Sequence, residues 1–419
     1  MNRSSLAGSN ILRVKKHNLR AVLLTFLHAG SLSRVQLAEQ TTLSNTTITN
    51  LTAELIEHGI IVETSDQATP GKARRGVGRP RTMLQLVPDA RFVVGVHIGI
   101  GMFRVAITNL HAEIVQNKIV NFSIDQPAEE VLQLITQTIQ AILAESAIEP
   151  YRILGIGVGA SGLVNYQTGI NLRAASLGWQ DVPIREHLED QLGLPVCVDN
   201  NVRAMALGEA YFGLGRGVDV LAFIYGRIGV GAGFVINGQL FRGFGAGAGE
   251  IGHTIVLPHN GALCRCGQRG CLETLVSEPV LLQDAWPLAE AYPDGVLASH
   301  LNKAVDDPVE AVFAAARAGD TPTLQMIEER AYYLGIALAN LVNVLNPEMI
   351  VLGGMFAQAG DLIIPVAEGT MRKTAFAQLG ERVRLQPTQF GWRAGVVGAA
   401  SLALMGLFYA ADRDLAVQV

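Results

Sequence analysis

Five apolar segments that end in glycine-rich turns constrain the fold of this 419-residue chain more than any other feature. They cover residues 91–109, 152–164, 194–210, 220–240 and 347–356. Helical stretches such as 130–145 lie between them. Apolar strands that alternate with helices indicate an α/β fold, in which binding sites form where the strands end. The length allows two or three domains, each with a full hydrophobic core.

The first 88 residues follow a different pattern, that of a helix-turn-helix with a wing. Residues 12–29 place apolar side chains at helical spacing and stop at Gly30, which is typical of a helix C-terminus. Ser33 and Ser44 can cap two further helices, the second of which runs from Asn45 to His58. The two strands of the wing are expected at "GIIVETS" and "TMLQLVP".

Polar residues at the start of the third predicted helix lie off its apolar stripe, where a recognition helix meets base edges in a DNA major groove. Residues 70–81 read "PGKARRGVGRPR", with five positive charges and three glycines, and such an arm can enter a narrow minor groove. The head is basic and the remainder acidic, as expected where a head binds a polyanion. The helix spacing alone also fits an ordinary three-helix bundle. The predicted DNA-binding residues are Asn45, Thr46, Thr47, Asn50, Arg74, Arg75, Arg79 and Arg81.

Three of the four cysteines fall within eight residues, in "CRCGQRGCLE" from Cys264 to Glu273. Three thiols cannot pair off as disulfides, and three thiolates are one ligand short of a closed tetrahedral zinc site. The low cysteine content also argues against a disulfide scaffold. The motif therefore leaves a fourth ligand to be found elsewhere in the chain.

Residues 245–279, "GAGAGEIGHTIVLPHNGALCRCGQRGCLETLVSEP", resemble the ROK family of bacterial sugar kinases, sugar-responsive repressors and related reading frames. "EIGH" followed by "CxCGxxGCLE" is the most specific part of a match that covers nearly the whole chain. The basic winged head and the "GRP" before the first body strand match the repressor branch. The resemblance implies an N-terminal winged helix-turn-helix followed by a two-lobed actin-like ATPase (ribonuclease H-like) sugar kinase fold.

The resemblance also implies how the chain is divided. Residues 1–88 would form the winged helix-turn-helix domain, with the basic wing or linker at 70–81. The first actin-like lobe would comprise 89–201 and about 395–419. The second lobe, 202–394, would carry the cysteine motif and a dimerisation surface.

In the family, the histidine of "EIGH" holds zinc together with the three cysteines. The resemblance therefore implies a structural zinc ion at His253, Cys264, Cys266 and Cys271, with no open position for catalysis. It also implies a sugar site, because carboxylates and amides there can bond to sugar hydroxyls. The implied sugar-binding residues are Asn200, Asn201, Glu250, His253 and Glu273.

Two positions depart from the pattern of the family's kinases. His97 stands where a kinase has the aspartate of Asp-x-Gly-x-Thr, and imidazole is a poor partner for Mg²⁺, which prefers oxygen ligands. Asn201 stands where a kinase has its general base, and an amide cannot accept the proton of a sugar hydroxyl near neutral pH. Arg227 and Ile228 replace a short Gly-Thr phosphate loop. No catalytic residue is therefore predicted, although a residual nucleotide site stays open.

These patterns predict a sugar-responsive transcriptional repressor that is not an enzyme. We expect it to bind double-stranded operator DNA as a homodimer or a pair of dimers, and to bind a sugar or sugar derivative as effector. Two alternatives stay open. One is an ATP-dependent sugar kinase with a regulatory DNA-binding head, and the other is a repressor whose effector is a protein.

One segment could be mistaken for a membrane span. Residues 394–411 carry no charge over 18 positions, but half of them are Ala or Gly, so a buried C-terminal helix is expected. The start of the chain has neither the apolar core nor the small-residue cleavage site of a secretory signal. We therefore expect a cytoplasmic protein without membrane contact.

Overall fold

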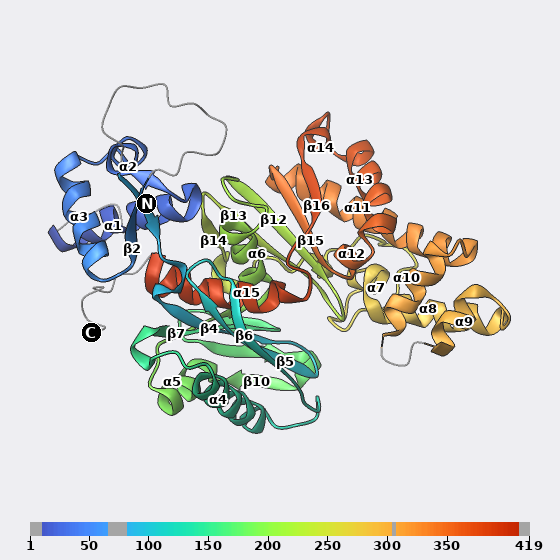
Figure 1. Cartoon of the computed structure of the whole chain (residues 1–419). Coiled ribbons are helices and arrows are strands. Elements are labelled where there is room, and N and C mark those ends of the chain that lie inside the picture. Colours follow the sequence, from blue (N-terminus) through green and yellow to red (C-terminus); the bar gives the residue numbers. More distant parts are fainter. Residues whose placement is uncertain (1–10, 66–81, 304–306, 410–419) are drawn as a thin grey trace.

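The structure, a computed structural model, describes residues 11–65, 82–303 and 307–409. A small head, drawn in blue, stands beside a larger body that contains two separate five-stranded sheets (Figure 1). The predicted α/β architecture is confirmed. The four arginines predicted to bind DNA from the wing lie outside the described residues: Arg74, Arg75, Arg79 and Arg81.

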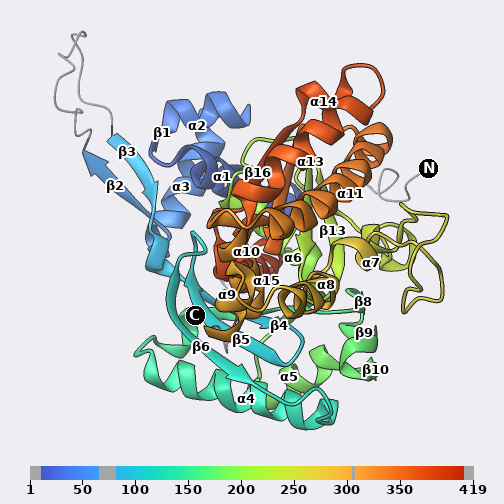
Figure 2. The same ribbon diagram turned by 90° about the vertical axis from the view of Figure 1, so that its right-hand side faces the viewer.

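Three helices and three short strands build the head. They are α1 (Ile11–Ala29), β1 (Leu32–Ser33), α2 (Arg34–Thr41), α3 (Asn45–Glu57), β2 (Ile61–Ser65) and β3 (Thr82–Leu86). Both predicted caps form, because the side chain of Ser33 accepts a hydrogen bond from the Gln36 backbone and that of Ser44 accepts one from Thr47. The strands pair in the order β1-β3-β2, and β2 and β3 extend from the head as a hairpin (Figure 2).

The first body sheet has strand order β11-β7-β4-β5-β6. Its strands are β4 (Phe92–Ile98), β5 (Met102–Asn109), β6 (Ile114–Asn121), β7 (Ile153–Ala160) and β11 (Val196–Asn200). Helices α4 (Ala128–Glu145) and α5 (Ile184–Leu192) cover one face (Figure 1). A small second sheet joins β8 (Leu163–Asn165), β9 (Ile170–Ala174) and β10 (Trp179–Val182). We call these elements the first lobe.

The second body sheet has strand order β14-β13-β12-β15-β16, and with its helices we call it the second lobe. Its strands are β12 (Val220–Gly226), β13 (Val230–Ile236), β14 (Gln239–Phe241), β15 (Met349–Gly354) and β16 (Arg384–Pro387). Its helices are α7 (Glu273–Val276), α8 (Glu278–Ala291), α9 (Val296–Lys303), α10 (Pro308–Arg317), α11 (Thr321–Leu345), α12 (Met355–Gln358), α13 (Gly360–Thr374) and α14 (Leu379–Arg382). Most of these helices gather at one end of the molecule (Figure 1).

Two helices, α6 (Asn201–Phe212) and α15 (Ala394–Ala403), run between the two sheets (Figure 1). Every residue of α6 is buried. The helices approach so closely that a Cβ atom on Gly398 would lie 2.6 Å from the carbonyl carbon of Ala204. On the other side of α15, a Cβ on Gly157 would lie 1.9 Å from the carbonyl oxygen of Ala399. Only glycine permits these backbones to come so near.

The C-terminal helix is part of the core. The segment Gly391–Tyr409 is long and apolar enough to cross a membrane, but it is mostly buried inside the protein. The prediction of a buried helix there is confirmed for the residues that the structure describes. Beyond α15 it continues as a π-helical turn, η8 (Leu404–Tyr409), and the Tyr409 hydroxyl donates a hydrogen bond to the backbone oxygen of Leu110.

The apolar core of the head is continuous with the helices between the sheets. Buried residues of α1, α6 and the C-terminal helix belong to one cluster, which includes Phe26, Leu207 and Phe408. At the end of α6, the Tyr211 ring lies 6.2 Å from that of His28 in α1. The head is therefore packed directly on the body, through the same helices that separate the two lobes.

Candidate functional site

The four predicted metal ligands come together at the edge of the second lobe. His253, Cys264, Cys266 and Cys271 each offer one ligand atom, and these atoms all lie within 4.8 Å of one another. Nδ1 of His253 is 3.6 Å from Sγ of Cys264, and Sγ of Cys266 is 3.6 Å from Sγ of Cys271. Zinc–sulfur bonds of about 2.3 Å in a tetrahedron require separations of this size. The cluster can hold a metal ion.

A tight hairpin presents the cysteines. The backbone of Cys264 donates to the Gln268 oxygen at 2.8 Å, and Gly267 closes the turn with a φ of 90°. Gly270 has a φ of 73°, and a Cβ there would lie 1.8 Å from the Leu257 carbonyl oxygen. Both glycines of "CxCGxxGC" are therefore required by the backbone, which explains their fixed places between the ligands.

The protonation of the cysteines favours metal binding at high pH. A hydrogen bond from the Gln268 backbone lowers the pKa of Cys266. Burial raises the pKa of Cys271 to about 12, so this thiol is protonated at neutral pH when no metal is bound. A metal ion must displace that proton, and its affinity therefore decreases as the pH falls.

Beside this cluster lie the predicted sugar-binding carboxylates, and the two differ in their surroundings. Glu273 is buried, where one carboxylate oxygen accepts from the Val230 backbone at 3.1 Å and the other accepts from Arg265 at 3.0 Å. Glu250 is exposed and is joined to the turn that carries His253, whose backbone donates to the Glu250 oxygen at 3.1 Å. Glu273 is thus held in place, and Glu250 is free to turn towards a ligand.

The two predicted amides lie where β11 meets α6, and both are engaged in hydrogen bonds. The side-chain oxygen of Asn200 caps α6 by accepting from Val202 at 2.9 Å and Arg203 at 3.1 Å, and its nitrogen donates to the Gly162 oxygen. Asn201 is buried, its nitrogen donates to the Ser161 hydroxyl at 3.2 Å, and its oxygen accepts from the Val202 backbone at 3.0 Å. Both amides therefore fix the start of α6, and Asn200 is the more exposed of the two.

Sequence reasoning missed Asp199, the residue directly before these amides. Its carboxylate is almost fully buried, and it accepts hydrogen bonds at 2.7 Å from Arg203 in α6 and from Arg242 after β14. The Arg242 guanidinium also lies 4.2 Å over the ring of Tyr166. An acidic residue at the end of an apolar strand was the available signal. With both oxygens bound to arginines, Asp199 is not placed to act as a general base.

Sequence reasoning also missed that arginines of the second lobe reach across to the first. Arg242 reaches Asp199, and Arg265, between two of the cysteines, donates to the Ser176 hydroxyl at 2.7 Å. Arg227, in the turn between β12 and β13, donates to the Met102 sulfur at 3.8 Å. These three contacts hold the lobes together around the amides and carboxylates.

His97 is buried in β4, on the face that packs against α15. Burial, and then the nearby charges of Arg104 and Arg227, lower the pKa of His97 to about 3, so the ring is neutral. A neutral imidazole supplies no oxygen ligand for Mg²⁺.

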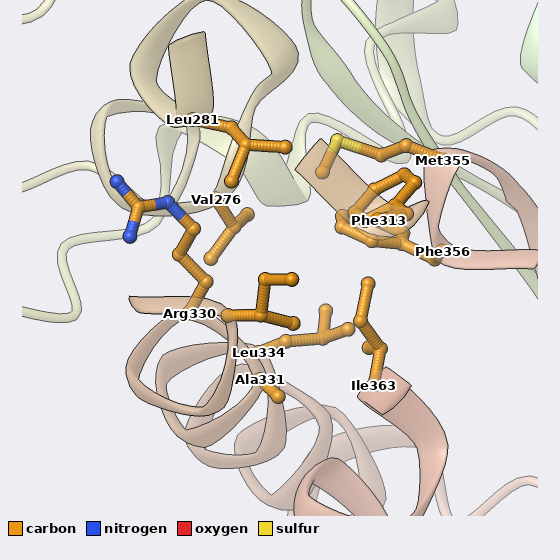
Figure 3. A pocket seen from close by; sticks show the side chains of 10 residues that line it. Val276, Leu281, Phe313, Arg330, Ala331, Leu334, Met355, Phe356 and Ile363 are labelled. Atoms are coloured by element: carbon orange, nitrogen blue, oxygen red, sulfur yellow. The ribbon is translucent and has the colours of Figure 1, made fainter. Parts of the chain in front are cut away.

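Two hollows in the structure lie away from these residues. A cavity of about 10 Å³ inside the second lobe, room for a single water molecule, is lined by apolar side chains such as Val276, Leu334 and Phe356 (Figure 3). The guanidinium of Arg330 points out of it (Figure 3). A surface hollow of about 590 Å³ lies in the first lobe between residues 124–128 and 175–182. None of the predicted site residues lines either one.

The family model for the ROK family matches residues 93–405. The chain belongs to the ROK family. A xylose repressor from Caldicellulosiruptor bescii is 31% identical over 392 residues, which cover 93% of this chain and 96% of that repressor. A glucokinase from Halalkalibacterium halodurans is 35% identical over 316 residues, which cover 74% of this chain and 94% of the glucokinase.

Among solved structures, a ROK family transcriptional regulator described as a homologue of the Escherichia coli MLC protein has the same fold. Its TM-score is 0.80 at 28% identity, with 95% of this chain and 97% of the regulator covered. The match to ROK regulators thus extends over almost the full length of the chain. The glucokinase match covers only about three quarters of it.

The buried ion pairs of Asp199 generate a prediction. The Asp199→Asn change leaves two arginines facing a neutral amide, and we expect it to lower the free energy of unfolding by about 3–5 kcal/mol. The matched control is Glu368→Gln, which breaks the exposed pair with Arg372 and should cost about 0–1 kcal/mol. Thermal and urea denaturation of both variants measure the difference, and equal losses would contradict this role for Asp199.

Proposed function

We propose that this protein is a sugar-responsive transcriptional repressor. The head, residues 1–88, binds operator DNA, and the body binds a sugar or sugar derivative between its two lobes without catalysing a reaction. The observation that carries the proposal is a winged head joined to a kinase-like body. The proposal is also supported by the inference that His97 and Asn201 stand where the family's kinases have aspartates. Full-length similarity to a xylose repressor supports it.

The division of the chain follows from this proposal. We infer a head of residues 1–88, a first lobe of 89–201 with about 395–419, and a second lobe of 202–394 that also carries the dimer interface. The protein would act in the cytoplasm as a homodimer, because a two-fold operator requires two heads. Pairing of two dimers is compatible with the same arrangement.

On the DNA side, the exposed residues of α3 support the proposal. Asn45, Thr46 and Asn50 are exposed at the start of that helix, where side chains reach base edges. Thr47 is engaged by Ser44, since their hydroxyl oxygens lie 2.9 Å apart, and it would act mainly in fixing the helix. The wing arginines would add phosphate and minor-groove contacts, which makes binding strongly dependent on salt concentration.

For the sugar, we infer that five side chains bond to hydroxyl groups: Asn200, Asn201, Glu250, His253 and Glu273. The two amides also hold the start of α6 in position. Arg265 bonds to Glu273 in this structure and would share that carboxylate with a bound sugar. Carboxylates and amides in a buried setting distinguish hydroxyl patterns well, because a wrong sugar leaves them unpaired.

Zinc is the metal that this cluster fits best. Three thiolates and one imidazole close a tetrahedron, so the ion would be structural and would leave no position for a reacting water. His253 would bind the metal through one ring nitrogen and could bond to the sugar through the other. The metal would thereby fix the hairpin that leads into Glu273.

We infer that α6 connects the sugar site to the head. It begins at Asn201 and ends at Phe212, and Tyr211 in its last turn contacts His28 of α1. The Tyr211 hydroxyl donates to the Gly238 oxygen, so the second lobe also acts on this end of the helix. A sugar that binds more tightly to one arrangement of the lobes would then change the position of the head, whereas equal affinity for both would change nothing.

The main alternative is an ATP-dependent sugar kinase with a DNA-binding head, since glucokinases belong to the same family. Incubation with Mg²⁺-ATP and a panel of hexoses and pentoses distinguishes the two. Sugar phosphate above a no-protein control would support the kinase. If no sugar raises the melting temperature, the effector is a protein partner, because a ligand at 100 times its Kd adds about 2.7 kcal/mol of stability.

The first prediction concerns Glu273. Glu273→Gln should weaken sugar binding about 10- to 100-fold, because it removes a charged hydrogen-bond acceptor, and should leave DNA affinity unchanged. The DNA is a labelled duplex that the protein selects from a random library. Xylose or glucose is titrated into the complex, and the fluorescence anisotropy of the duplex measures the release of DNA. Glu328→Gln on the exposed face of α11 is the control. Failure to select any duplex would contradict the proposed function.

The second prediction concerns the metal. Purified protein should contain about one zinc ion per chain, and Cys266→Ala should lose it and melt at a lower temperature, since metal binding stabilises the folded hairpin. Cys197→Ala, outside the cluster, should keep its zinc. Elemental analysis at several pH values should show the loss increasing as the pH falls. Full metal content in Cys266→Ala would exclude this ligand set.

The third prediction concerns the contact between α1 and α6. His28→Ala should retain operator binding without sugar but lose most of the sugar-induced release, because the link between ligand and head is weakened. His17→Ala on the exposed side of α1 should respond as the natural protein does. The same anisotropy titration measures both, and an unchanged sugar response in His28→Ala would show that the signal takes another route.

A further inference from the structure

Basic side chains from both lobes meet near the N-terminus of α15. His97 in β4 and Arg104 in β5 are directly paired in the sheet, so their side chains lie on the same face. Arg227 reaches this region from the second lobe, where its guanidinium contacts Met102 at the start of β5. Its charge and that of Arg104 both act on the buried His97. Three nitrogen-bearing groups thus gather at one place between the lobes.

Three buried nitrogen atoms of this group lack partners among the described residues. Neither ring nitrogen of His97 has a hydrogen-bond partner among the described residues, although the side chain is only 3% exposed. The buried Nε of Arg104 has none among them either. Buried groups of this kind are normally bonded, and an unbonded one costs about 1–3 kcal/mol. A bound ligand would provide the missing hydrogen-bond partners.

The available contacts of the arginines are weak. The guanidinium carbon of Arg104 lies 5.8 Å from the centre of the Trp392 ring. The face of that ring attracts the positive charge but is not an ordinary hydrogen-bond acceptor for the N–H groups. The Arg227 contact with Met102 is to a sulfur, a poor acceptor, and its ion pair with Glu278 is long at 3.6 Å. Burial raises the pKa of Glu278 to about 7, so this carboxylate is partly neutral at physiological pH. The local charge is therefore positive.

The first turn of α15 covers this group. The His97 ring packs on that turn, since a Cβ on Gly395 would lie 2.6 Å from Nδ1 of His97. Two guanidinium groups and a neutral imidazole that can donate one hydrogen bond form a set of donors with few acceptors.

We propose that His97, Arg104 and Arg227 form a metal-independent site for a phosphate group between the two lobes. A kinase would hold such a group through Mg²⁺ and a carboxylate, whereas this chain offers direct guanidinium bonds, which suit phosphate in their geometry. Because Arg104 and Arg227 come from different lobes, a bound phosphate holds the lobes together.

The position of the site indicates what carries the phosphate. The turn that bears Arg227 also contains Gly229 and leads into Val230, whose backbone donates to Glu273. On the other side, His97 in β4 pairs with Gly159 in β7. A Cβ atom built on Gly159 would lie 3.3 Å from Cα of Asn201, so Asn201 packs against this strand. The phosphate site and the sugar groups therefore adjoin. Resting here on the proposed function, we infer that the ligand is a phosphorylated sugar.

The experiment measures binding of phosphate compounds by thermal shift without Mg²⁺, at an ionic strength held constant with KCl. The probes are inorganic phosphate, glucose 6-phosphate and ATP. We expect inorganic phosphate and glucose 6-phosphate to raise the melting temperature, and Arg227→Ala and Arg104→Gln each to weaken their binding about tenfold or more. Arg372→Ala, an exposed arginine on α13, is the matched control. If ATP binds and glucose 6-phosphate does not, the phosphate site stands, but its ligand is a nucleotide and the inference of a phosphorylated sugar is wrong.

Three results would overturn the proposal. The first is that no phosphate compound raises the melting temperature more than KCl does. The second is that both arginine variants bind phosphate as tightly as the natural protein, and the third is that binding requires Mg²⁺. Arg227 is on the surface side of the turn, so its variant should fold even if Arg104→Gln does not. Operator binding is measured separately on the same protein. A failure of the phosphate site is therefore distinguishable from a failure of the repressor function.

Discussion

The buried carboxylate of Asp199 is the interaction on which the arrangement of the molecule depends. It lies at the end of β11 and binds Arg203 in α6 and Arg242 in the second lobe, and so fixes three elements at one point. In a medium of low dielectric constant such a charge must be matched, because an unpaired buried ion is strongly destabilising. The direction of α6, and with it the position of Asn201, follows from this pairing.

The body has the fold of the family's kinases, and the proposed function depends on the chemistry of a few of its residues. Asn201 can donate and accept hydrogen bonds but cannot take a proton, and His97 is neutral and buried. Glu273 is held in place by Val230 and Arg265. In the proposed repressor, these donors and acceptors would serve recognition, in which affinity rather than turnover carries the signal.

Local features of this protein were predictable from the sequence, and long-range ones were not. Ser33 and Ser44 cap helices through bonds to residues three positions away, so their roles are visible in the sequence itself. The ligand set required the family resemblance, because His253 lies outside the cysteine motif. The pairing of Asp199 with Arg242 joins two different sheets, and no periodicity signals it. The sequence predicted a ligand role for Asn200 but did not reveal that its amide also caps α6.

The shared core of the head and α6 has a geometric consequence. Because Phe26, Leu207 and Phe408 pack in one cluster, the head is carried as a rigid extension of a helix about 18 Å long, at 1.5 Å per residue. In the proposed dimer, two such heads would have to match half-sites about 34 Å apart. A rotation of about 10° over the length of α6 displaces its end by about 3 Å, close to one base step of about 3.4 Å. In the proposed repressor, such a displacement of each head would be enough to put both heads out of register with the DNA groove.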